Sequence, residues 1–132
     1  MLKHSPDEQS NTVLNSPGAL DDYDLAMALK ALGSPTRLRI FNMLMEGVQC
    51  NCEISRELGI SLSLISYHVR ILGEAGLVQS EHDVQDTRWV YYSVDRDMLR
   101  RLMRQLRYLL DPGRIQPRVP SCGPRYCRTC GE

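Results

Sequence analysis

The cysteines are the residues of this chain most suited to chemistry, and they fall into two groups. Two lie close together in the middle of the chain and three near its end: Cys50 and Cys52, then Cys122, Cys127 and Cys130. Thiolate sulfur binds soft ions and can also be oxidised. An odd number of clustered thiols does not fit the disulfide framework of a small secreted protein. The spacing therefore predicts an ion-binding or redox-sensing protein of a reducing compartment.

The overall composition fits one globular domain and disfavours several classes of protein. The 132 residues carry 16 basic and 16 acidic side chains, and 42% are hydrophobic. No stretch approaches the roughly 20 apolar residues of a membrane helix, and the first residues lack a signal peptide pattern. No nucleophile–base pair, phosphate-binding glycine loop or acid pair stands at catalytic spacing. We therefore expect a cytoplasmic protein that is neither an enzyme nor bound to a membrane.

Hydrophobic spacing and capping residues predict helices interrupted by one hairpin. Helices are expected at 22–32, 34–46, 53–58, 62–75 and 95–110, and a β-hairpin at 77–94. In the second helix we expect the inward stripe at Leu38, Phe41, Leu44 and Met45. This order of elements is mainly α with a β-hairpin wing, a winged helix-turn-helix in which helix 62–75 enters the DNA major groove.

The chain divides by composition into three parts. Residues 1–20 are expected to form a flexible arm, 21–110 the DNA-binding and dimerisation domain, and 111–132 a flexible tail that holds three cysteines. Residues 1–24 contain five acidic residues and one lysine, so the remaining chain carries an excess of positive charge. The apolar stripe of helix 95–110 is wider than one core absorbs. It predicts a homodimer through the first and last helices.

Two stretches carry a resemblance to a known family. The G-S-P-T-R-L segment at 33–38 and the block I-S-Y-H-V-x-x-L-x-E-A-G-L-V at 65–78 resemble the ArsR/SmtB family of metal- and metalloid-responsive repressors, arsenic-sensor type. The likeness covers about residues 22–110. It implies a homodimer that holds double-stranded operator DNA and releases it when an inducer binds. It also implies an inducer site at Cys50 and Cys52, since arsenic-, cadmium- and lead-responsive members carry Cys-x-Cys there.

The remaining ligands decide which ion is the inducer. As(III) prefers three thiolates, and Ser55 stands where such sensors often place a third cysteine. A tail cysteine must then supply it, so all five cysteines are candidate ligands for As(III), with Cd(II), Pb(II) or Zn(II) as alternatives. The tail could fold back onto Cys50 and Cys52 in its own or the partner subunit, bind an inducer alone, or be redox-active. A repressor that responds to thiol oxidation or persulfides remains a further alternative.

Candidate DNA contacts lie on the helix at 62–75 and on the wing. With Ile65, Val69 and Leu72 facing the core, the outward positions are Ser63, Ser66, Tyr67 and Arg70. Ser61 at the start of this helix and Arg88 at the base of the wing complete the set, although Arg88 could equally pair with Asp86. We expect His68 to be structural. A protein-interaction module that does not bind DNA is the second class of function considered.

Overall fold

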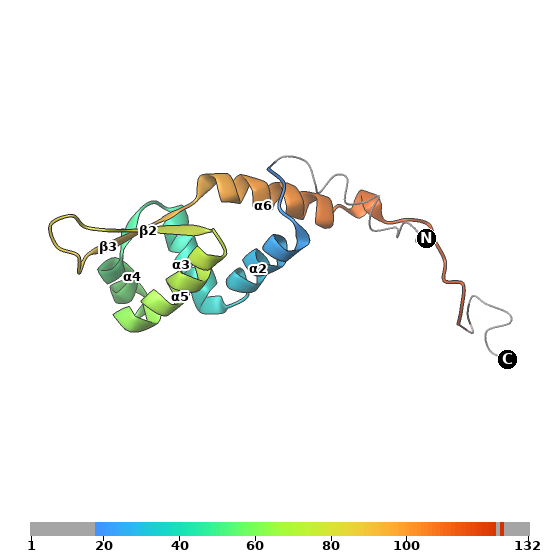
Figure 1. The fold of residues 1–132 in the computed structure, drawn as a ribbon. Coiled ribbons are helices and arrows are strands. Elements are labelled where there is room, and N and C mark those ends of the chain that lie inside the picture. The colour runs from blue at the N-terminus through green and yellow to red at the C-terminus, as the bar shows by residue number, and fades with distance from the viewer. Residues whose placement is uncertain (1–17, 124, 126–132) are drawn as a thin grey trace.

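The computed structural model describes residues 18–123 and 125, and these residues form helices around a small sheet (Figure 1). The elements in chain order are α2 (Asp22–Leu32), α3 (Pro35–Met45), β1 (Gln49–Cys50), α4 (Asn51–Leu58), α5 (Leu62–Glu74), β2 (Val78–His82), β3 (Val90–Val94), α6 (Arg96–Leu109) and the 3-10 turn η1 (Pro112–Arg114). Helices α4 and α5 form the helix-turn-helix, and β2 and β3 form the wing. The winged helix-turn-helix prediction is therefore confirmed.

Side-chain caps define where most of the helices begin. The side chains of Asp21, Ser34, Ser61 and Asp95 each accept a hydrogen bond from the backbone N–H three residues later, at 2.7, 3.4, 3.1 and 2.9 Å. Such caps satisfy N–H groups that have no partner inside the helix. The expected starts of α2, α3, α5 and α6 are confirmed within a residue or two.

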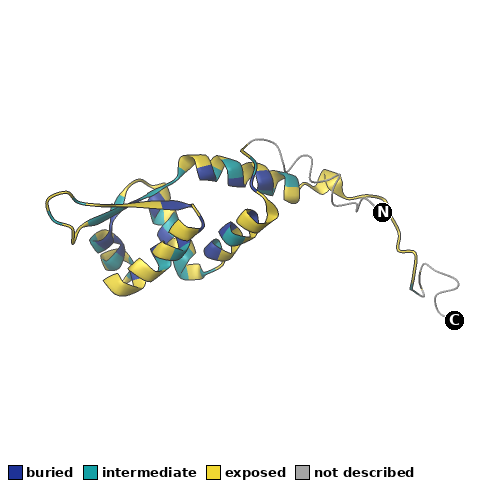
Figure 2. Ribbon diagram, in the orientation of Figure 1, coloured by how far each residue is buried: buried dark blue, intermediate teal, exposed yellow. Residues whose placement is uncertain are grey.

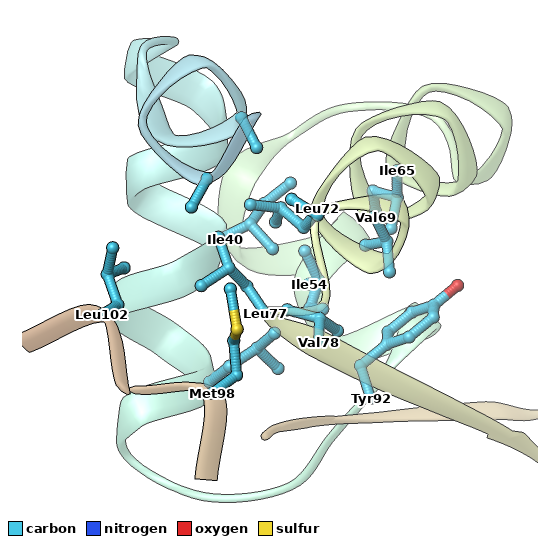
Figure 3. Packing of buried hydrophobic residues seen from close by; sticks show 14 of the residues in the cluster. Ile40, Ile54, Ile65, Val69, Leu72, Leu77, Val78, Tyr92, Met98 and Leu102 are labelled. Atoms are coloured by element: carbon cyan, nitrogen blue, oxygen red, sulfur yellow. The ribbon is translucent and has the colours of Figure 1, made fainter. Parts of the chain in front are cut away.

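Buried aliphatic side chains from every helix meet in one core (Figure 3). Ile40 of α3, Ile54 of α4, Ile65 of α5 and Leu77 before the wing are completely buried. The expected stripe of α3 was partly wrong: Ile40 and Leu44 face the core, while 46% of Leu38 and 56% of Met45 are exposed. The helix is rotated so that the Ile40–Leu44 line, with a spacing of four residues, points inward.

The wing belongs to a sheet with one more strand than the sequence predicts. The strand order is β1-β3-β2 and both pairings are antiparallel. The two-residue strand β1 pairs Gln49 with Tyr92 and Cys50 with Tyr91. The segment that carries the first cysteine is therefore part of the sheet that carries the wing.

The folded body begins before the expected domain boundary. Leu20, which the sequence places in the arm, is 1% exposed and packs in the core. The backbone oxygen of Gly18 accepts a hydrogen bond of 2.7 Å from Arg101 Nε on α6. Residues 1–17 lie outside the described residues, so the arm itself stays a prediction.

Helix α6 has an inward face and an apolar strip that the single chain leaves uncovered. Met98, Leu102 and Gln105 are buried, whereas 60% of Met103 and 69% of the C-cap residue Leu110 are exposed. Figure 2 shows buried and exposed positions alternating along α6. Within the described part of the chain, no helix combines the length and apolar character that crossing a bilayer requires.

Candidate thiol site and nucleic-acid interface

Cys50 and Cys52 lie at the junction between the sheet and the helix-turn-helix. Cys50 ends β1 and is the N-cap residue of α4, with an extended backbone, and it is buried. Cys52 is half-buried in the first turn of α4, and both thiols are free. Helix α4 begins at Asn51, two residues before the expected start at Glu53. Both sulfur atoms therefore belong to the turn that opens the helix-turn-helix.

A carboxylate stands beside the first of these thiols. Glu53 Oε1 accepts a hydrogen bond of 2.8 Å from the Cys50 backbone N–H. This bond, followed by a bond with the Cys50 side chain, lowers the pKa of Glu53 below its usual value. Glu53 is therefore ionised at neutral pH. Its negative charge therefore stands next to the backbone of Cys50.

The residue between the two cysteines joins them to the wing. Asn51 is 8% exposed, and its Nδ2 donates to the backbone oxygen of Arg88 at 3.3 Å. Its Oδ1 accepts from the Cys52 N–H at 3.0 Å. The sequence gives Asn51 no distinguishing pattern, because its partner lies 37 residues away. This contact is a feature that sequence reasoning missed.

A second connection runs through the strand pair. Tyr91, opposite Cys50, donates its hydroxyl hydrogen to Asp83 Oδ2 at 3.2 Å. Asp83 Oδ1 also accepts from the backbone N–H groups of Gln85 and Asp86, at 2.8 and 3.1 Å. The wing loop is thus tied by Asp83 to the strand that pairs with β1.

The tail cysteines are not brought to this site in the described residues. Cys122 is exposed, and the tail leaves α6 at the end of the molecule opposite to α4 and the wing (Figure 1). Cys127 and Cys130 lie outside the described residues. Within residues 18–123 and 125, no group of three or more His, Cys, Asp or Glu side chains is placed to hold a metal ion. In this part of the chain, Cys50 and Cys52 are therefore two free thiols without a third such side chain placed to complete a metal site.

The predicted DNA-facing residues of α5 all lie on its outer side. Ile65, Val69 and Leu72 are buried, and the exposed positions include Ser61, Ser63, Ser66, Tyr67 and Arg70 (Figure 2). The Ser61 hydroxyl is engaged as the helix cap. Two apolar side chains share this surface, since 46% of Leu62 and 41% of Leu64 are exposed.

A groove separates α5 from the wing. Its lining includes polar side chains from both elements: Ser66 and Arg70 of α5, and Ser80, His82 and Tyr92 of the strands. The carboxylate of Glu74 and the apolar side chains of Val69 and Val78 also line it, so the groove is mixed in charge and polarity.

Arg88 pairs within the wing. Its Nη2 lies 2.7 Å from Asp86 Oδ2 and its Nε 3.0 Å from Asp86 Oδ1, while the Arg88 side chain is 88% exposed. Hydrogen bonds from Arg88 lower the pKa of Asp86. The pairing with Asp86 that the sequence allows is present, and a DNA contact of Arg88 stays a prediction.

His68 packs α5 against the start of α3. Its Nδ1 lies 3.2 Å from Arg37 Nη1, and its ring meets the edge of Tyr67 with the centroids 5.2 Å apart. Burial, and then the positive charge of Arg37, lower the pKa of His68. A neutral imidazole that accepts from Arg37 fits the structural role expected for it.

Comparisons with known proteins agree with this geometry. Residues 34–80 match the model of the family described as bacterial regulatory protein, arsR family. An uncharacterised helix-turn-helix transcriptional regulator of Methanocaldococcus jannaschii is 33% identical over 87 residues, which are 64% of this chain and 94% of the relative. A cadmium resistance regulatory protein, the CadC homolog of Staphylococcus aureus, is 30% identical over 83 residues, 62% of this chain and 66% of the relative.

Solved structures give the same assignment. A possible transcriptional regulator for arsenical resistance has a TM-score of 0.55 and 33% identity, with 62% of this chain and 82% of that chain covered. HlyU from Vibrio cholerae has a TM-score of 0.53 and 27% identity, with 67% and 92% covered. The chain therefore belongs to the ArsR family of bacterial regulatory proteins, which are DNA-binding transcriptional regulators and not enzymes.

Proposed function

We propose that the protein is a homodimeric repressor that releases double-stranded operator DNA when As(III) binds its cysteine thiolates. The observation that carries this proposal is the position of two free cysteines in the opening turn of α4, the first helix of the helix-turn-helix. A structure with 33% identity is named for arsenical resistance, which supports the choice of ion.

The ion would act on the DNA-binding unit through α4. As(III) takes three thiolates, so Cys50 and Cys52 would be joined by one tail cysteine, Cys122, Cys127 or Cys130. Helix α4 packs directly against α5, so a change in its first turn is passed to the helix that faces DNA. Allosteric coupling of about 1–3 kcal/mol, or roughly 5–150-fold in affinity, is enough to derepress a gene.

The DNA surface would combine α5 with the wing. Ser63, Ser66, Tyr67 and Arg70 of α5 would contact the major groove, and Ser61 and Arg88 the sugar–phosphate backbone. Leu62 and Leu64 add apolar surface that suits the methyl groups of thymine. Readout by short hydroxyls and leucines favours a site rich in A·T pairs.

The dimer would form through α2 and α6. Helix α2 contacts α6, and both expose apolar side chains: Tyr23 and Leu29 on α2, and Met103, Leu109 and Leu110 on and just after α6. A second copy would bury both. A two-fold dimer presents its two α5 helices to half-sites about one turn of DNA apart.

A Cd(II)-responsive repressor is the second candidate. The Staphylococcus aureus relative is named for cadmium resistance, and the ionised Glu53 beside Cys50 adds negative charge that suits a divalent cation. Cd(II) takes up to four ligands, so this function would require more of the tail than As(III) does.

The test is a fluorescence anisotropy titration of the reduced protein on a labelled duplex from its own promoter. Arsenite and cadmium are added separately, and a scrambled duplex of equal length is the control. Release by arsenite near one equivalent per protomer supports the proposal, and release by cadmium alone supports the second candidate. Tight binding that neither ion reverses would reject both and direct attention to thiol oxidation.

A further inference from the structure

We propose that Asn51 is the positioning residue that transmits occupancy of the thiol site to the wing, so that inducer binding displaces the hairpin as well as α5. This inference rests on the proposed function of Cys50 and Cys52 as the inducer site. It assigns a role to a residue that has no ligand chemistry of its own.

The side chain of Asn51 bridges the two parts directly. Its amide oxygen accepts from the Cys52 N–H at 3.0 Å, and its amide nitrogen donates to the Arg88 oxygen at 3.3 Å. The side chain is held in place because Asn51 is only 8% exposed. Because one planar amide makes both bonds, movement of the Cys52 backbone would also shift the donor that bonds to Arg88.

The strand pair makes the same connection from the other cysteine. Cys50 lies opposite Tyr91, and Tyr91 bonds to Asp83, which organises the wing loop. An ion that draws the two sulfur atoms together would therefore strain both contacts with the wing, the Asn51–Arg88 bond and the Cys50–Tyr91 strand pairing. Asn51 is the attachment that a side-chain substitution can remove without altering the backbone ladder.

The wing end of the bridge is a DNA-facing residue. The oxygen that Asn51 holds belongs to Arg88, whose guanidinium is 88% exposed beside Asp86. Loss of the Asn51 bond changes the position from which this cation reaches the DNA backbone. The inducer would thus weaken phosphate contacts at the wing.

A competing route runs from α4 to α5 without the wing. Ser55 Oγ donates to the backbone oxygen of Ile60 at 2.7 Å, which holds the turn between the two helices. If the effect of the ion reaches α5 only through this turn, loss of the Ser55 bond should reduce the coupling between ion binding and DNA release, and loss of the Asn51 bonds should not. Ser55→Ala is therefore the matched control, since it also removes one side-chain bond of α4.

The chain contains its own reporter of wing position. Trp89 is the only tryptophan in the sequence, and it directly follows Arg88. Its backbone N–H donates to Asp86 at 3.0 Å, and its oxygen accepts from Asp83 at 2.9 Å. A displacement of the wing base should therefore change its fluorescence.

The experiment compares the full-length reduced wild type with Asn51→Ala, Asn51→Asp and Ser55→Ala. Arsenite and cadmium are the probes. Ion binding is followed by sulfur-to-metal absorption, wing position by Trp89 emission, and coupling by the ratio of operator affinities without and with ion. Asn51→Asp keeps the acceptor for Cys52 and suits a helix N-terminus, but it removes the donor to Arg88.

We expect both Asn51 variants to stay folded and to bind one ion per protomer, with a melting temperature lowered by the lost hydrogen bonds. Both should lose the Trp89 response and most of the affinity ratio. If the ion quenched Trp89 fluorescence directly, the Trp89 response would persist in these variants, because the ion still binds. Loss of the response therefore reports displacement of the wing. A wild-type ratio and Trp89 response in both variants, or loss of coupling in Ser55→Ala alone, would overturn the inference. Failure of the wild type to bind the ion or release DNA would instead reject the proposed function.

Discussion

The two groups of cysteines differ in what surrounds them. Cys50 and Cys52 lie in the folded body, between a strand of the sheet and the first helix of the DNA-binding unit. Cys122 is exposed and belongs to the segment after η1, which extends away from the wing (Figure 1). Under the proposed function, an ion on the first pair would strain a packed structure, whereas a tail thiolate would only add a ligand. The body would then supply the response to the ion, and the tail would supply the remaining ligands.

The largest difference between the two ends should appear in stability. Ile54→Ala removes a fully buried side chain two residues after Cys52, and we expect a loss of about 2–5 kcal/mol in the free energy of unfolding. Val119→Ala in the tail, where the side chain is 65% exposed, should change it by less than about 0.5 kcal/mol. Urea denaturation measures both. Equal, small losses would mean that the thiol end is not part of the cooperative core.

The next difference concerns release from DNA. Cys50→Ser should keep operator affinity but lose ion-dependent release, a coupling of roughly 5–150-fold. Cys122→Ser should keep full release at saturating ion and only require more ion, because the tail adds affinity and not strain. Anisotropy at several arsenite concentrations distinguishes the two. Loss of release in the Cys122 variant at saturation would make the tail the trigger.

A third comparison tests charge at the two ends. Arg70→Ala should weaken operator binding by about 1–3 kcal/mol, and a phosphate contact would also lower the salt slope by about one. Arg118→Ala removes the same charge from an exposed tail position and should leave both quantities nearly unchanged. Binding measured across salt concentrations gives the result. Equal effects would indicate nonspecific attraction by overall charge.

The smallest expected effect is a pH dependence confined to the body. Burial holds the pKa of His68 below its ordinary 6.5, so the unfolded chain takes up this proton first as pH falls. Stability from the neutral imidazole is therefore complete above about pH 6.5 and declines below it. His68→Gln should reduce the fall in melting temperature between pH 7 and pH 5. An unchanged slope would show that another group causes the acid sensitivity.

The helices could be predicted because their signals are local. Each expected cap residue bonds to a backbone N–H only three residues later, so the signal lies within one helical turn. Such caps form at Ser34, Ser61 and Asp95. The two-residue strand β1 could not be predicted, since it exists only through pairing with β3 some forty residues later. The rotation of α3 depends on which face its neighbours leave open, which spacing alone does not decide.

The candidate site also has a part that the sequence predicts and a part that it does not. Cys50 and Cys52 can be predicted, because their spacing is itself the signal. Asn51 cannot be singled out in the sequence, because its long-range contact is a bond to a backbone oxygen of the wing, 37 residues away. The sequence predicts the start of α4 two residues too late, because no serine or aspartate cap marks it. Its first turn is stabilised instead by the bond between the Glu53 side chain and the Cys50 backbone.

The short strand β1 also determines how the wing opens. It gives β3 a partner on both edges near Tyr91 and Tyr92, while β2 keeps one edge open to water. Amide hydrogens of β3 should therefore exchange with solvent more slowly than those on the outer edge of β2. Thermal opening of the hairpin should begin at β2, and β3 should stay with the body until the whole domain unfolds.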